Sequence, residues 1–167
     1  MKVGLSLVIA IFGFLSSYGF AVEENVKLAA LMRGLRNDMG VVIAPLKVPA
    51  GTEVTDAMIL DAMLRTKTAR YLLTEFQSKA GKVQEDKLVK EEFTPIAIQG
   101  LSGSALTDAL AKIATFSTQV GEKFAASETA YETELAKVAS ERNFAAVAKL
   151  MKEAQALQKE AHTLFNP

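Results

Sequence analysis

The stretch that decides the fold is ENVKLAALMRGLRNDMGVV, residues 24–42. Its large apolar residues recur every three or four positions: Leu28, Leu31, Met32, Leu35, Met39 and Val42. This period matches the 3.6 residues of an α-helical turn and predicts an amphipathic helix with one apolar face. The helix must end before Pro45, because proline cannot continue it.

Three further segments show the same pattern, and all of them avoid the four prolines at 45, 49, 95 and 167. A second helix is predicted from Thr55, a favourable N-cap residue, to about Gly81. A third begins near 102 or 104 and runs past 135 without a helix-breaking residue, and a fourth covers 143–165. Residues 82–100 are expected to form a long connection with a short helical turn.

Four amphipathic helices without the alternation typical of strands have few ways to bury their apolar faces. The commonest solution is an antiparallel up-down four-helix bundle, so we predict an all-α fold of this kind. In that topology the first and last helices lie side by side and antiparallel. The start of the first helix is then level with the end of the fourth.

The first 21 residues have the composition of a secretory signal peptide. One lysine, Lys2, precedes an apolar run over 3–15, and small residues lead to Ala21. The run is shorter than the 20 or so residues of a membrane span. We therefore expect cleavage after Ala21, no membrane association afterwards, and a single domain over 22–167 in the bacterial periplasm.

Composition excludes several kinds of chemistry. The chain has no cysteine, so it can form no disulfide, no thiolate metal site and no covalent haem attachment. Its 19 basic and 19 acidic residues balance, which argues against nucleic acid as a partner.

The carboxylates and the histidine also give little support for an enzyme site. Glu91 and Glu92 are neighbours that would not face one another on a helix. Ferritin-like iron sites need more histidines than the one present. We expect no enzyme activity.

That one histidine, His162, lies in the last turn of the predicted fourth helix, at the margin of its apolar face. Met32 lies in the apolar face of the first helix, roughly 12 Å from its start, and His162 lies roughly 5 Å from the end of the fourth. The two residues should therefore meet at one open end of the bundle. Histidine and methionine together form a haem-iron ligand pair. Met39, about 10 Å deeper, is the alternative methionine.

Each residue by itself also has a purely structural explanation. A methionine in an apolar face is usually part of the core. A lone histidine near a helix C-terminus is often stabilised there by the helix dipole.

The run from Met32 to Val42 resembles the opening helix of the cytochrome b562 family, and the segment from Phe144 to His162 fits that family's final helix without a gap. This resemblance places His162 at the histidine ligand. It implies one haem b, held non-covalently, that passes single electrons to a periplasmic redox protein which the sequence does not identify. The protein would be a monomer or a weak dimer. Related cytochromes c′ carry C-x-x-C-H in this helix, and here residues 158–162 keep the histidine alone.

Apolar side chains near the two ligands are expected to line the haem pocket: Leu28, Leu35, Phe144, Met151 and Phe165, with Phe116 as a further candidate. This expectation rests on packing and not on a motif.

An alternative function is a cofactor-free periplasmic helical binding protein. Residues 73–77, LTEFQ, match the L-T-x-x-Q pattern of small helical stress chaperones.

Overall fold

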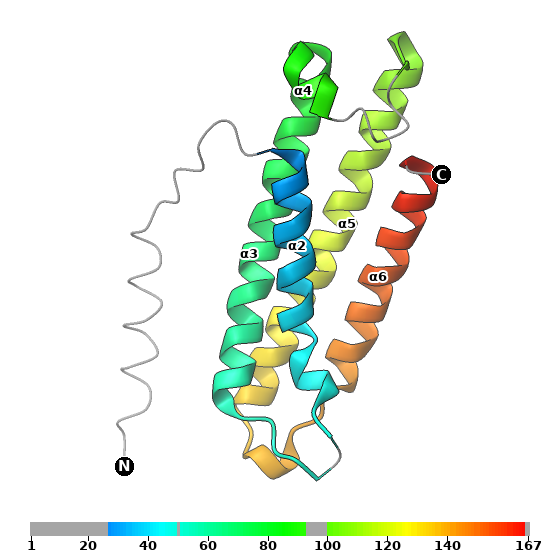
Figure 1. The fold of residues 1–167 in the computed structure, drawn as a ribbon. Helices are drawn as coiled ribbons and strands as arrows, with labels where there is room; N and C mark the ends of the chain where they lie inside the picture. The colour runs from blue at the N-terminus through cyan, green and yellow to red at the C-terminus, as the bar shows by residue number, and fades with distance from the viewer. Residues whose placement is uncertain (1–26, 50, 93–99, 166–167) are drawn as a thin grey trace.

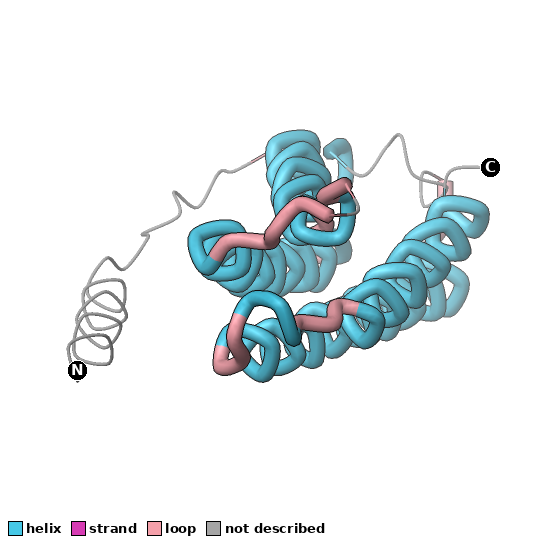
Figure 2. Tube along the Cα trace, turned by 90° about the horizontal axis from the view of Figure 1, so that it is seen from below, coloured by secondary structure: helices cyan, strands magenta, loops and turns pink. Residues whose placement is uncertain are grey.

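The computed structural model describes residues 27–49, 51–92 and 100–165, and Figure 1 traces the remainder in grey. The side chains of residues 90 and 162–165 are outside the description as well. The predicted signal peptide, 1–21, therefore lies outside the described residues. No strand occurs in the described ranges (Figure 2), which confirms the all-helical prediction for them.

The longer helices are α2 (Leu28–Val42), α3 (Asp56–Gly81), α5 (Gly103–Leu135) and α6 (Ala145–Phe165). A short helix, α4 (Lys87–Glu92), is the helical turn predicted in the connection after α3. Three 3-10 turns complete the description: η1 (Ala44–Lys47), η2 (Lys82–Gln84) and η3 (Ala139–Glu141). Thr55 is the N-cap of α3 as predicted, because its hydroxyl accepts a hydrogen bond from the Met58 N–H at 3.3 Å.

The four long helices run alternately down and up in Figure 1. α2 packs against α3, α3 against α5, and α5 against α6. α2 and α6 are not among the closely packed pairs of the described chain. We call the end where α2 and α5 finish and α3 and α6 begin the lower end, as it is drawn in Figure 1.

Buried apolar side chains form two clusters. The lower core cluster combines residues from all four long helices. Its largest fully buried side chains are Val42, Ile59, Phe124, Tyr131, Val147 and Met151. The upper core cluster is smaller and consists of Leu28, Ala80, Val83, Leu106 and Ile113. Burial of this apolar surface supplies the main free energy that holds the helices together.

Tyr131 joins α5 to α2 at the lower end, inside the core. Its side chain is fully buried, and its hydroxyl donates a hydrogen bond of 2.6 Å to the backbone carbonyl of Val42. That carbonyl belongs to the last turn of α2, where carbonyls have no partner inside the helix. Burial raises the pKa of Tyr131, so the hydroxyl keeps the proton that it donates. The bond fixes the end of α2 to α5.

Arg142 joins three further segments at the same end. Its side chain is only 5% exposed. The guanidinium donates to the carbonyls of Val54 at 2.9 Å and Glu134 at 3.2 Å, and it pairs with the carboxylate of Asp56. These contacts hold the start of α3 beside the end of α5 and the connection into α6.

Glu134 is a buried acidic residue in the same network. Its carboxylate accepts hydrogen bonds from Lys137 Nζ at 2.7 Å and from the Asn143 N–H at 2.6 Å. Burial by itself would raise the pKa of Glu134, but these two donors and the charges of Lys137 and Arg142 outweigh burial and lower it. The ionised form is therefore favoured by folding.

Replacement of Tyr131 by Phe should lower the free energy of unfolding by about 1–3 kcal/mol, because the buried carbonyl of Val42 loses its donor. Urea unfolding followed by circular dichroism measures the change. Tyr71→Phe is the matched control, because Tyr71 is 38% exposed and should show almost no effect. Equal effects of the two substitutions would contradict this role for Tyr131.

Glu134 should also make the stability depend on pH. Because its pKa is lower in the folded than in the unfolded state, its contribution is complete above the unfolded value of about 4.3 and is lost as pH falls through the folded value. Glu134→Gln should therefore lower the Tm at pH 7, and this loss should shrink as the pH falls below about 4. A Tm loss independent of pH, or the same loss from Glu132→Gln at an exposed neighbouring site, would refute this explanation.

Candidate functional site

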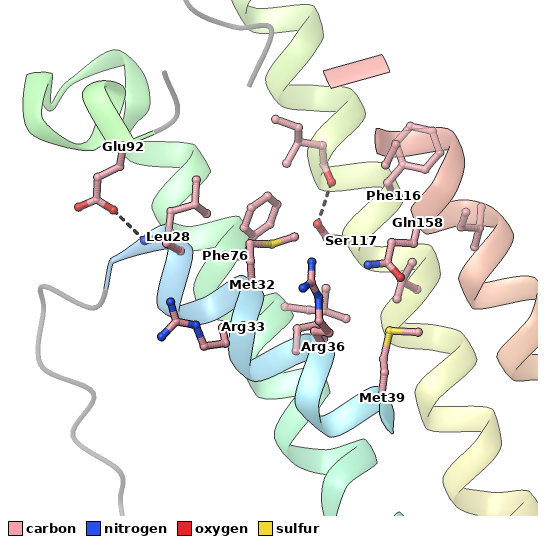
Figure 3. A pocket seen from close by; sticks show the side chains of 17 residues that line it. Leu28, Met32, Arg33, Arg36, Met39, Phe76, Glu92, Phe116, Ser117 and Gln158 are labelled. Carbon is pink, nitrogen blue, oxygen red and sulfur yellow. Dashed lines mark hydrogen bonds between the residues drawn. The ribbon is translucent and has the colours of Figure 1, made fainter. Parts of the chain in front are cut away.

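A pocket of about 520 Å³ opens between α2 and α6, with α3 and α5 behind it (Figure 3). Its volume falls within the range of roughly 300–1,000 Å³ that is common for small-molecule sites. The pocket exists because α2 packs on α3 and α6 packs on α5, while α2 and α6 do not pack closely on each other.

The pocket lies where the two core clusters meet. Leu28 and Ile113 of the upper cluster and Leu35, Leu73 and Val120 of the lower cluster all line it. Its inner walls are therefore mainly apolar. A molecule in this pocket would complete the core between the two clusters.

The residues of α2 that line the pocket include Met32, Arg36 and Met39. The two methionines are half-buried and Arg36 is exposed. In Figure 3 the guanidinium of Arg36 lies between the side chains of Met32 and Met39. Arg33, which is also exposed, contributes a second cation to the lining.

These two arginines differ from the other three in the chain. Arg65, Arg70 and Arg142 each form an ion pair with a carboxylate. Arg33 and Arg36 form none with any residue that the structure describes.

Glu92 supplies the acidic group of the lining, from the end of α4. Its carboxylate accepts hydrogen bonds from the Leu28 N–H at 2.9 Å and from Lys79 Nζ at 2.7 Å (Figure 3 shows the first). Burial would raise the pKa of Glu92, but Lys79, the Leu28 N–H and the charge of Lys27 outweigh burial and lower it. Glu92 thus satisfies a free N–H at the start of α2 and is itself already neutralised.

Several residues predicted from the sequence line this pocket. Met32, the proposed iron ligand, does so, and so do Leu28 and Leu35. Phe116 of α5 lines it as well. Met39, the alternative ligand, also lies in the lining, seven residues nearer the lower end.

Phe144 and Met151 do not line the pocket. Met151 is 2% exposed within the lower core cluster, and Phe144 packs on Tyr131 with ring centroids 5.8 Å apart. The prediction rested on packing near the two ligands and left out the distance along the helix from His162. Phe144 precedes His162 by 18 residues, which is about 27 Å of helix.

The side chains of His162 and Phe165 lie outside the described residues, so their part in the site stays a prediction. The backbone at 162 belongs to α6. It directly follows Ala161 and comes one helical turn after Gln158, and both of these residues line the pocket.

Sequence reasoning missed Arg33, Arg36, Phe76, Glu92 and Gln158 as lining residues. No sequence signal singled out Arg36, because it lies at the exposed edge of the apolar face, where a charged residue is common.

A scan against models of known protein families found no match, and searches of curated proteins and of solved structures found none.

None of the described helices combines the length and hydropathy needed to cross a membrane. Within the described ranges, no three or more His, Cys, Asp or Glu residues gather in a way that could hold a metal ion.

Proposed function

We propose that this chain is a periplasmic b-type cytochrome resembling the cytochrome b562 family. In this proposal residues 22–167 form an antiparallel up-down four-helix bundle that holds one haem b without covalent bonds and carries single electrons. One observation carries the proposal. Met32 lines a largely apolar pocket that extends to Ala161, the residue before the chain's one histidine.

The chemistry of the pocket fits a haem. Apolar walls from the two core clusters suit the flat hydrophobic macrocycle, and the volume of about 520 Å³ suits a ligand of that class. The thioether of Met32 is a soft iron ligand. Arg33 and Arg36 supply positive charge for the acidic groups of a haem. The absence of cysteine from the sequence requires non-covalent binding.

Each residue has a definite role in this proposal. Met32 and His162 would hold the haem iron, and the Met32 thioether would favour the ferrous state and so raise the reduction potential. The bound haem would supply the one-electron chemistry. Leu28, Leu35 and Phe116 exclude water from its faces, which keeps the local dielectric low.

No substrate pocket or catalytic residue is part of this proposal. The partner would be another redox protein in the periplasm, and the chain would act as a monomer or a weak dimer. Electrons would pass through the edge of the cofactor at the opening of the pocket.

The alternative function as a chaperone-like binder rests on Leu73, Thr74 and Gln77. In the structure Leu73 is buried in the lower core cluster. Gln77 donates to the Ala114 carbonyl at 3.1 Å and to Thr118 at 3.0 Å, and thus joins α3 to α5. Thr74 donates to the carbonyl of Arg70 within its own helix. Packing thus accounts for all three residues, which favours the cytochrome proposal.

Titration of the mature protein with hemin tests the proposal by absorption spectroscopy. The reduced complex should show the sharp α-band of low-spin haem b. His162→Ala should abolish tight binding, and Met32→Ala should convert the spectrum to a high-spin form. Met39→Ala is the matched control and should leave the low-spin spectrum intact, because Met39 lies about 10 Å nearer the lower end.

Binding that is no tighter for the wild type than for His162→Ala would overturn the cytochrome proposal. The chain would then be a haem-free helical protein. A high-spin spectrum from Met39→Ala instead of Met32→Ala would keep the cytochrome proposal and reassign the methionine ligand.

A further inference from the structure

Arg36 is an exposed residue of α2 that lines the pocket beside the apolar residues of that helix. Met32, Arg36 and Met39 follow one another at spacings of four and three residues, and all three line the pocket. Side chains at these spacings lie one above another on one helix face. The buried Leu35 occupies the apolar position between the two methionines, and Arg36 lies beside it at the exposed edge of the apolar face. An exposed arginine that also lines an apolar pocket lies at the boundary between the pocket and solvent.

The positive charge at this position is not neutralised by the described chain. Arg36 has no ion pair with any described residue, and the same holds for Arg33, three residues earlier. The carboxylate in the lining, Glu92, is already bound by Lys79 and by the Leu28 N–H. The pocket therefore combines apolar walls with two cations that can pair with a ligand.

We propose that Arg36 anchors a carboxylate of the molecule that occupies the pocket, and that Arg33 adds to the attraction. The ligand class is an apolar body that carries carboxylate groups. This inference rests on the proposed function in one respect, since in a haem the carboxylates are the two propionates.

Arginine suits this role because its planar guanidinium can donate two parallel hydrogen bonds to one carboxylate. The location strengthens the interaction, since a charge pair at the edge of an apolar pocket is screened less than one on an open surface. Arg36 acts as a positioning residue. It determines which edge of the ligand lies at the opening, while the apolar body lies against residues such as Leu35 and Phe116.

The test compares hemin with hemin dimethyl ester, whose propionates carry no charge. Dissociation constants are measured by absorption titration for the wild type, Arg36→Gln, Arg36→Lys and Arg33→Gln. The matched control is Lys152→Gln, which removes an exposed cation from α6 away from the pocket lining.

Arg36→Gln should weaken hemin binding about tenfold, as loss of one charge-assisted pair implies. It should leave binding of the ester unchanged. Arg36→Lys should restore part of the affinity, Arg33→Gln should have a smaller effect than Arg36→Gln, and Lys152→Gln should have none. Rising salt should weaken wild-type binding of hemin more than that of the ester.

If the wild type binds hemin but Arg36→Gln weakens the binding of hemin and of the ester equally or not at all, the anchor is overturned while the cytochrome proposal stands.

A second probe covers the case in which the wild type does not bind hemin. An 11-carbon fatty acid with a dansyl group, and its methyl ester, report binding by fluorescence without iron. Arg36-dependent binding of this acid alone, with no hemin binding, would support the anchor and overturn the cytochrome proposal. A wild type that binds neither acidic probe would overturn both.

Discussion

The hydrogen bond from the Tyr131 hydroxyl to the Val42 carbonyl determines how the helices can be arranged. It lies inside the lower core cluster and satisfies a carbonyl at the end of α2 that would otherwise be buried without a donor. This bond holds α2 to α5, and Arg142 holds α3 to α5 and to the connection before α6, so these elements are joined at the lower end. α2 and α6 are not closely packed on each other, and the pocket lies between them.

Groups outside α2 pair with free backbone groups at both of its ends. At the C-terminal end, the Tyr131 hydroxyl donates a hydrogen bond to a free carbonyl. At the N-terminal end, the Glu92 carboxylate accepts a hydrogen bond from a free N–H. Glu92 stands at the end of α4, and Lys79 of α3 holds its carboxylate at the start of α2. α2 is thus fixed at both ends by groups outside itself. Its pocket face, with Met32 and Arg36, is not closely packed against α6.

Helix periodicity predicted most of the fold. The N-cap at Thr55, the end of α3 at Gly81 and the unbroken length of α5 followed from local residue chemistry, since each depends on a few neighbouring positions. The contacts that close the lower end could not be predicted in this way. The bond from Tyr131 to Val42 joins residues 89 positions apart, and nothing in either local sequence identifies its partner.

Helix periodicity predicted which face of a helix carries site residues better than it predicted their position along the helix axis. Met32, Leu28 and Leu35 line the pocket because they lie on one face of a single helix, close together in sequence. Met151 belongs to the lower core cluster and Phe144 packs against it, so neither residue lines the pocket. Arg36 was not predicted because it lies at the exposed edge of the apolar face, where a charged residue is common.

In the proposed cytochrome, Met32 is an iron ligand in the pocket between α2 and α6. Proton and carbon NMR of the reduced, hemin-loaded mature protein with labelled methionine methyl groups tests this role. One methyl signal should be displaced far upfield by the haem ring current, and it should be lost when Met32 is replaced by Leu. Residues 22–167 contain five methionines. Five methyl signals at ordinary positions would contradict the role of Met32, and so would an upfield signal that persists in Met32→Leu and disappears in another methionine variant.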